Sequence, residues 1–314
     1  MSEKLRKRQI WENSLRDLCR RMRQDWSFRG SGSLIWGYHT VLEPPYKEVD
    51  ESLPTPEDLA KDHYAMFRGE PFATSYSTDW SDWTTIQIIP SPSLLIDQES
   101  TIRFLLSVKE ISRLGFEVIG TDKAVKLQIV ALREEADFVL DQIRIHFPQT
   151  TIKTDVENLI TPLLESAENE DDACDRTIVV DLELAKPFVY PLKIWKGYQS
   201  EIWHSLSSIL SRLNEREVGI FQTLFTRTVL PWARSVVRWA TEHQVYGRSI
   251  EEKINHPLYA VVVRVAAAAD VRERAQDIIN QMIGALSVLD NPIGNNLIPL
   301  RNSIYDGKAQ YYDF

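Results

Sequence analysis

Residues Phe116–Leu132, which read FEVIGTDKAVKLQIVAL, are the most informative part of the chain for its fold. Two apolar and β-branched runs, 116–119 and 125–132, flank the turn-forming residues 120–123, GTDK, and this pattern predicts a β-hairpin with a four-residue loop. A helix is expected directly afterwards, at Arg133–Phe147, because apolar residues recur there on one helical stripe.

The segments on either side of the hairpin and helix complete a unit. Thr84–Ile89 is short and β-branched, as expected of a strand, and the apolar spacing of Gln98–Ile111 suits a helix. Pro148 ends the helix that follows the hairpin, and Thr150–Lys153 is expected to form a last strand. The predicted order of this unit is β-α-β-β-α-β.

The same order is predicted again further along the chain. Strands are expected at Thr177–Leu184, Val218–Thr226, Tyr259–Ala267 and Asn296–Leu300, and helices at Ser200–Leu213 and Asp270–Leu289. The spacing of Asp270 and Glu273 is that of a capping box at the start of the second helix. An insertion at 228–255 should hold one helix at Pro231–Glu242 and a short one capped by Ser249 and Glu252.

These patterns predict an α+β fold made of two tandem ferredoxin-like (βαββαβ) units, with a helical insertion in the second unit and a basic helix at the N-terminus. Each unit would place two helices on one face of its own four-stranded antiparallel sheet. A single larger mixed sheet is the structural alternative.

Charge is distributed unevenly along the chain. Residues 1–29 carry nine cations and four acids, on a chain whose net charge is −9. Residues 157–183 carry nine acids and one arginine, and their centre lacks apolar periodicity, which predicts a solvated linker or an acidic docking site. The predicted division is a basic helix and irregular segment at 1–82, the first unit at 83–155, an acidic linker at 156–176, the second unit at 177–305 and a tail at 306–314.

Composition excludes several classes of protein but does not indicate an activity. The longest run free of Asp, Glu, Lys and Arg is Trp83–Ile96, which is too short for a membrane span, and the N-terminus lacks the apolar core of a secretory signal. We therefore expect a cytoplasmic protein. Two cysteines, Cys19 and Cys174, argue against a disulfide scaffold. The net negative charge argues against non-specific nucleic-acid binding over the whole surface.

Motifs for catalysis and ligand binding are not found in the sequence. The chain has no glycine-rich phosphate loop and no GxSxG nucleophile elbow. The six histidines form no HExxH or HxxxH pair, and there is no CxxC. We therefore expect no catalytic residue, no cofactor and no metal in this chain, and we expect that it is not an enzyme.

Two groups of residues are candidates for contacts with a partner. Trp232 and Trp239 lie in the predicted insertion, where large aromatic side chains serve either a partner surface or the core of the domain. The basic residues near the N-terminus could bind nucleic acid, dock on an acidic protein surface, or simply form a solvated helix face. Those in the candidate site are Lys4, Arg6, Lys7, Arg8, Arg20, Arg21 and Arg23.

Three motifs in the second half resemble a known family. They are Glu217–Gln222 (EVGIFQ), the run HPLYAVVVRV at 256–265, and NNLIPL at 295–300. Together they resemble the region that precedes the motor domain in bacterial HerA/FtsK-type ATPases of type IV secretion and conjugative DNA transfer. The matching positions that can be named are Glu217, Gln222, His256 and Arg264, and the motifs are structural rather than catalytic. Arg264, if buried, requires an acidic partner; a structural salt bridge and a DNA or nucleotide contact are the two alternatives.

The resemblance implies a role in DNA translocation. The family's Walker motifs should lie downstream of this region, so we expect either a piece of a longer ATPase or a free-standing relative without the motor. The leading hypothesis is a non-catalytic assembly or adaptor module of a DNA-translocating ATPase system, in conjugation or in defence against foreign DNA. Its partner would be a neighbouring subunit, a second copy or a P-loop ATPase. One alternative is a nucleic-acid-binding module that uses an open sheet face and the basic N-terminus. The other is an enzyme with a dispersed active site.

Overall fold

The computed structural model describes residues 83–91, 98–111, 113–154, 177–186, 188–193, 201–228, 232–242, 247–255 and 257–299. The predicted basic helix and irregular segment (1–82), the acidic linker (156–176) and the tail (306–314) lie entirely outside these ranges. So do His256 and all seven candidate basic residues of the N-terminus.

Both predicted sets of strands and helices are present. The first half runs β1 (Trp83–Pro90), α3 (Gln98–Ser107), β2 (Leu114–Thr121), β3 (Val125–Leu132), α4 (Arg133–His146) and β4 (Thr150–Lys153). The second half runs β5 (Thr177–Leu184), α7 (Glu201–Leu210), β6 (Val218–Arg227), α8 (Trp232–Glu242), α9 (Arg248–Ile254), β7 (Tyr259–Ala268), α10 (Arg272–Leu286), a 3₁₀ turn (Ser287–Leu289) and β8 (Leu297–Pro299).

The prediction of one sheet for each half is corrected by the strand pairing. The eight strands form a single sheet with the order β4-β1-β3-β2-β6-β7-β5-β8, in which every pair of neighbours is antiparallel. The two halves join where β2 pairs with β6 over eight residues, from Leu114↔Phe225 to Thr121↔Val218. Pairing satisfies the backbone N–H and C=O groups that two separate sheets would each leave open at an edge.

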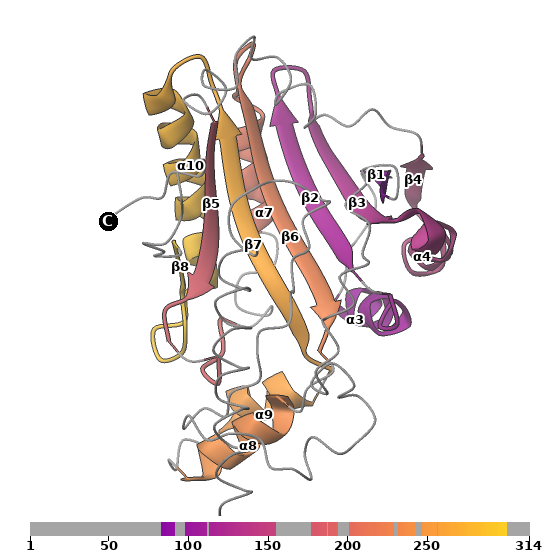
Figure 1. Ribbon diagram of the computed structural model, residues 1–314, viewed down its shortest axis with the longest axis vertical. Coiled ribbons are helices and arrows are strands. Elements are labelled where there is room, and N and C mark those ends of the chain that lie inside the picture. Colours follow the sequence, from indigo (N-terminus) through magenta and orange to yellow (C-terminus); the bar gives the residue numbers. More distant parts are fainter. Residues whose placement is uncertain are drawn as a thin grey trace, which may run out of the picture.

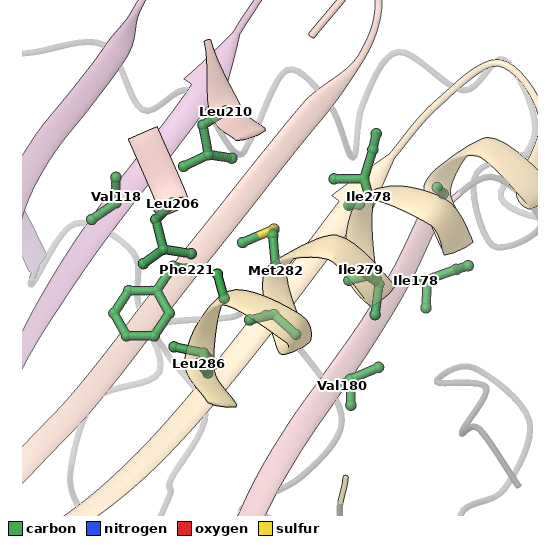
Figure 2. Packing of buried hydrophobic residues seen from close by; sticks show 14 of the residues in the cluster. Val118, Ile178, Val180, Leu206, Leu210, Phe221, Ile278, Ile279, Met282 and Leu286 are labelled. Carbon is green, nitrogen blue, oxygen red and sulfur yellow. The ribbon is translucent and has the colours of Figure 1, made fainter. Parts of the chain in front are cut away.

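Four helices lie on one face of this sheet. Helices α3 and α4 pack on β1, β2 and β3, with Ile86, Leu114 and Ile129 among the buried strand residues. Helices α7 and α10 pack on β2 and β5–β7, and this larger cluster is shown in Figure 2. Helices α8 and α9 lie together beyond one end of the sheet (Figure 1).

Two predicted helix caps are wrong. Helix α10 begins after Val271, whose extended backbone serves as the N-cap, while Asp270 lies 3.9 Å from the Arg216 guanidinium. Helix α9 begins at Arg248 with Gly247 as its N-cap, so Ser249 falls inside the first turn. In both places the extended residue that ends the incoming chain fixes the start of the helix.

Two glycines allow α7 to approach the junction of the two halves. Gly120 and Gly219 face each other across β2 and β6, and both lie beneath Leu210 at the end of α7. A Cβ on Gly120 would lie 2.6 Å from Leu210 Cβ and 2.8 Å from its carbonyl oxygen. A Cβ on Gly219 would meet only the tip of the same side chain, with Leu210 Cδ2 at 2.6 Å.

We expect Gly120→Ala to destabilise the fold by about 3 kcal/mol, because the new methyl group collides with the backbone of α7. The matched variant Gly219→Ala should cost only about 1 kcal/mol, because Leu210 Cδ2 can rotate away. Urea unfolding of the two variants measures the difference. Equal losses would contradict the close approach of α7 at Gly120.

Candidate functional site

A row of polar side chains crosses the face of the sheet opposite the four helices. Register places one polar residue on each of five adjacent strands directly opposite the next. In order across the sheet they are Gln128 (β3), Glu117 (β2), Gln222 (β6), Arg264 (β7) and Asp181 (β5), and we call these five residues the polar row. All five are buried, and Arg264 is only 2% exposed.

The alternation of each strand explains why the polar row shares one face. On β2, Phe116 and Val118 face the helices, so Glu117 between them points to the opposite side. The same side carries apolar neighbours of the row, including Ile119, Val130, Ile220 and Ala266. The row is therefore a polar line inside an apolar surface.

Hydrogen bonds connect the five residues from end to end. Arg264 binds Asp181 with two parallel bonds, Nε to Oδ1 at 2.5 Å and Nη2 to Oδ2 at 3.2 Å. Its Nη1 donates to Gln222 Oε1 at 3.4 Å, and Gln222 Nε2 in turn donates to Glu117 Oε1 at 2.8 Å. Gln128 Nε2 donates to the other oxygen of Glu117. Asp181 is thus the acidic partner that a buried Arg264 requires.

The electrostatics of the row are asymmetric. Asp181 and Arg264 form a bidentate pair, so their charges compensate each other. Glu117 has two amide donors, and no cation is among its hydrogen-bond partners in the described residues. Burial raises the pKa of Glu117 from 4.5 to about 7, and the hydrogen bonds from Gln222 and Gln128 oppose this shift only in part.

A second carboxylate, Glu217, has the opposite environment. It lies in the turn before β6 and accepts two bonds from Arg274 of α10, Nε to Oε1 at 2.8 Å and Nη2 to Oε2 at 3.0 Å. The backbone N–H of Asn214 donates to it as well, at 2.9 Å. These bonds, that of Arg274 first, lower the pKa of Glu217 to about 2. Glu217 therefore fastens the start of β6 to the first turn of α10.

Asn295 connects the loop before β8 to the segment after β5 through hydrogen bonds. It is fully buried; its Oδ1 accepts the backbone N–H of Lys186 at 2.9 Å, and its Nδ2 donates to the carbonyls of Lys186 and Tyr190 at 2.9 and 3.2 Å. Its own backbone N–H donates to Pro191 at 2.9 Å. The NNLIPL motif thus begins with a structural residue.

The segment that Asn295 holds carries the aromatic rings against which the two candidate tryptophans pack. Trp232 meets Phe188 edge to face at 5.2 Å and is 7% exposed. Trp239 meets Tyr190 in the same geometry, also at 5.2 Å, and is half-buried. Phe188 and Trp239 also pack against a buried cluster that contains Val189, Val236 and Ile250. A contact of either tryptophan with a partner protein remains a prediction.

The structure brings together only some of the residues singled out from the sequence. Gln222 and Arg264 meet in the polar row, whereas Glu217 and the two tryptophans lie elsewhere. Sequence reasoning missed Glu117, Gln128 and Asp181. The available signal was a single polar residue at the centre of an apolar strand, as in LGFEVIG, KLQIVA and IVVDLEL. Among the described residues, no group of three His, Cys, Asp or Glu side chains could hold a metal ion.

We expect Asp181→Asn to destabilise the protein by about 3–5 kcal/mol, because it removes the carboxylate that compensates the buried charge of Arg264. Asp141→Asn is the matched control, since Asp141 pairs with Arg144 on the surface and should cost less than about 1 kcal/mol. Denaturant unfolding measures both. Similar losses for the two variants would contradict the role given to the buried pair.

We expect Asn295→Asp to cost about 2–4 kcal/mol, because a carboxylate would face the carbonyls of Lys186 and Tyr190 without a hydrogen to donate. Hydrogen exchange should become faster in α8, which packs on the segment that Asn295 holds. Asn296→Asp makes the same chemical change at the half-buried neighbour and serves as the control. Unchanged exchange in α8 would show that the insertion does not depend on this tie.

Comparison with known proteins gives no family for the chain. No protein-family model matches it, and no curated protein does. Solved structures similar to it include a chitooligosaccharide oxidase, at 12% identity and a TM-score of 0.34 over 66% of this chain and 43% of that one. A glycopeptide hexose oxidase, solved with teicoplanin, has 6% identity and a TM-score of 0.30 over 66% and 41%. A variant of berberine bridge enzyme, described as a reticuline dehydrogenase, has 10% identity and a TM-score of 0.27 over 66% and 40%.

These likenesses correct one expectation and support no activity. The similar solved structures are enzymes, so the expectation that this chain is not an enzyme is withdrawn. The chain spans about two fifths of the length of each of them. At TM-scores of 0.27 to 0.34 the likeness carries no argument for an oxidase reaction. None of the described helices is long and apolar enough to cross a bilayer.

Proposed function

We propose that this chain is an assembly module of a DNA-translocating ATPase system, in conjugative transfer or in defence against foreign DNA. In this proposal it is built from two ferredoxin-like units and acts through contacts with neighbouring subunits or with a P-loop ATPase. The resemblance of residues 217–222, 256–265 and 295–300 to the region preceding HerA/FtsK-type motors supports the pathway. The strand arrangement supports the two-unit architecture, and the exposed surface supports action through protein contacts.

The arrangement of the two halves supports the two-unit architecture. Each half runs β-α-β-β-α-β, and within each half the strands lie in the order fourth, first, third, second. This is the arrangement of a ferredoxin-like sheet, with α8 and α9 inserted between the two middle strands of the second half. The two second strands, β2 and β6, then meet at the junction.

The buried polar residues of the three motifs stabilise the fold and do not form a contact surface. Gln222 and Arg264 hold the polar row, Glu217 fastens β6 to α10, and Asn295 ties the chain to the segment that supports α8. Each of these side chains is buried. A contact with another protein must therefore use other residues of the surface.

The observation that carries the proposal is a pair of exposed apolar side chains on α4. Phe138 is 47% exposed and Ile145 is 64% exposed. They are seven residues apart, about two helical turns, and so lie on the same side of the helix. The opposite side of α4, with Val139 and Ile143, is packed on the sheet. An aromatic and a large aliphatic side chain exposed together are typical of a protein contact.

The burial of the sheet face supports a protein contact more than the nucleic-acid alternative. The sheet face without described helices is buried at its centre, where the polar row and Ile119, Val130 and Ile220 lie. A base could not stack on these side chains in this structure. DNA binding through another part of the chain is an outcome that the following experiment detects.

We expect the double variant Phe138→Ser/Ile145→Ser to lose association with a second copy or with a P-loop ATPase while keeping its fold, because both side chains are exposed. Sedimentation of the chain alone and mixed with a HerA/FtsK-type ATPase measures the mass of the assembly. Ile293→Ser is the control, since Ile293 is 87% exposed and lies in the loop before β8.

Three results would count against this proposal. Unchanged assembly in the double variant would remove α4 from the contact. A wild-type chain that stays monomeric and binds no ATPase would contradict the assembly role. Retention of the chain on DNA, with a steep dependence on salt, would favour the nucleic-acid alternative.

A further inference from the structure

The polar row contains one more carboxylate than it contains cations. Asp181 and Arg264 compensate each other through two parallel hydrogen bonds. Among the described residues, Glu117 accepts hydrogen bonds only from the neutral amides of Gln222 and Gln128, so it adds an uncompensated negative charge to the row when it is ionised. An isolated ionised carboxylate in a protein interior is unfavourable, and such groups commonly take up a proton instead.

The row also contains a buried acceptor without a donor. Gln128 donates its Nε2 to Glu117, but its Oε1 is buried and has no hydrogen-bond partner in the structure. A buried polar atom in this state lowers stability. Among the five residues of the row, a protonated Glu117 is the group that could add an O–H donor next to Gln128.

We infer that Glu117 is a proton-binding site at the junction of the two halves. One proton from solvent forms an O–H bond on the Glu117 oxygen that faces Gln128. The Gln128 amide turns by 180°, so that its Oε1 accepts this O–H and its Nε2 takes the buried position that Oε1 had held. Gln222 Nε2 keeps its bond to the other oxygen of Glu117, and the row becomes neutral.

Among the described residues, the charged groups around Glu117 do not replace this proton. On the same side of the sheet, Lys126 lies two residues before Gln128 on β3, and β6 contributes the amide of Gln222. Arg264 and Asp181 follow on β7 and β5, already paired with each other. Beyond Gln128 the register continues through Gln87 on β1 to Lys153 on β4, which is exposed. Burial raises the pKa of Glu117 to about 7, in agreement with this geometry.

Proton binding at Glu117 links the stability of the fold to pH. The pKa is higher in the folded chain than the ordinary value of 4.5, so the folded state holds the proton more tightly than the unfolded state. The stabilisation is complete below about pH 4.5 and is lost as the pH rises to about 7. Between pH 5 and pH 8 this group alone should lower the folding equilibrium constant by roughly 50-fold.

The test compares wild type with Glu117→Gln, which mimics the neutral side chain. Urea unfolding at intervals from pH 5 to pH 8 should show that the stability of the wild type falls as the pH rises, whereas the variant lacks this fall. The slope should correspond to uptake of about one proton on folding. Glu217→Gln is the matched control. The pKa of Glu217 is lowered to about 2, so its substitution should leave the slope between pH 5 and pH 8 unchanged.

A second measurement does not depend on the folding of a variant. In the wild-type protein labelled with ¹³C at glutamate side-chain carboxyls, the Glu117 signal should titrate with a midpoint near pH 7. A midpoint near 4.5 would overturn the inference. So would equal slopes of stability against pH for wild type and Glu117→Gln. Because neither measurement uses a partner, both are independent of the proposed assembly role.

Discussion

The antiparallel pairing of β2 with β6 is the constraint on which the rest of the structure depends. It joins the two halves through eight residue pairs and leaves the short strands β4 and β8 at the outer edges of the sheet. Without it, each half would expose one long apolar strand with unpaired backbone groups. The pairing also determines where α7 lies, because Gly120 and Gly219 meet under Leu210 only in this register.

We interpret the polar row as a device that specifies this register. Side chains alternate between the two faces of a strand, so a slip of one residue would move Glu117 or Gln222 onto the helix-covered face, among apolar side chains. The charged and amide groups of the row find partners only when all five strands are aligned. The cost is an uncompensated buried carboxylate, and a proton bound at Glu117 would reduce that cost.

The residues that carry the family resemblance act on the fold. Glu217, Arg264 and Asn295 each connect elements that are distant in the sequence, through bonds to Arg274, Asp181 and the 186–191 segment. Partner contacts therefore have to be sought at exposed positions such as those on α4.

The sequence by itself determined the elements, because periodicity is a local property. Strands such as Thr150–Lys153 and Thr177–Leu184 were predicted with the bounds they have, and the apolar stripe of α4 identified its packed side. Tertiary structure decided the rest. The single sheet follows from pairing between strands about a hundred residues apart, and the N-cap of α10 follows from the extended backbone of Val271. The sequence indicated that Arg264, if buried, would require an acidic partner. Only the register of five strands selected Asp181 as that partner and brought Glu117 into the same row, because no local pattern encodes which strands become neighbours.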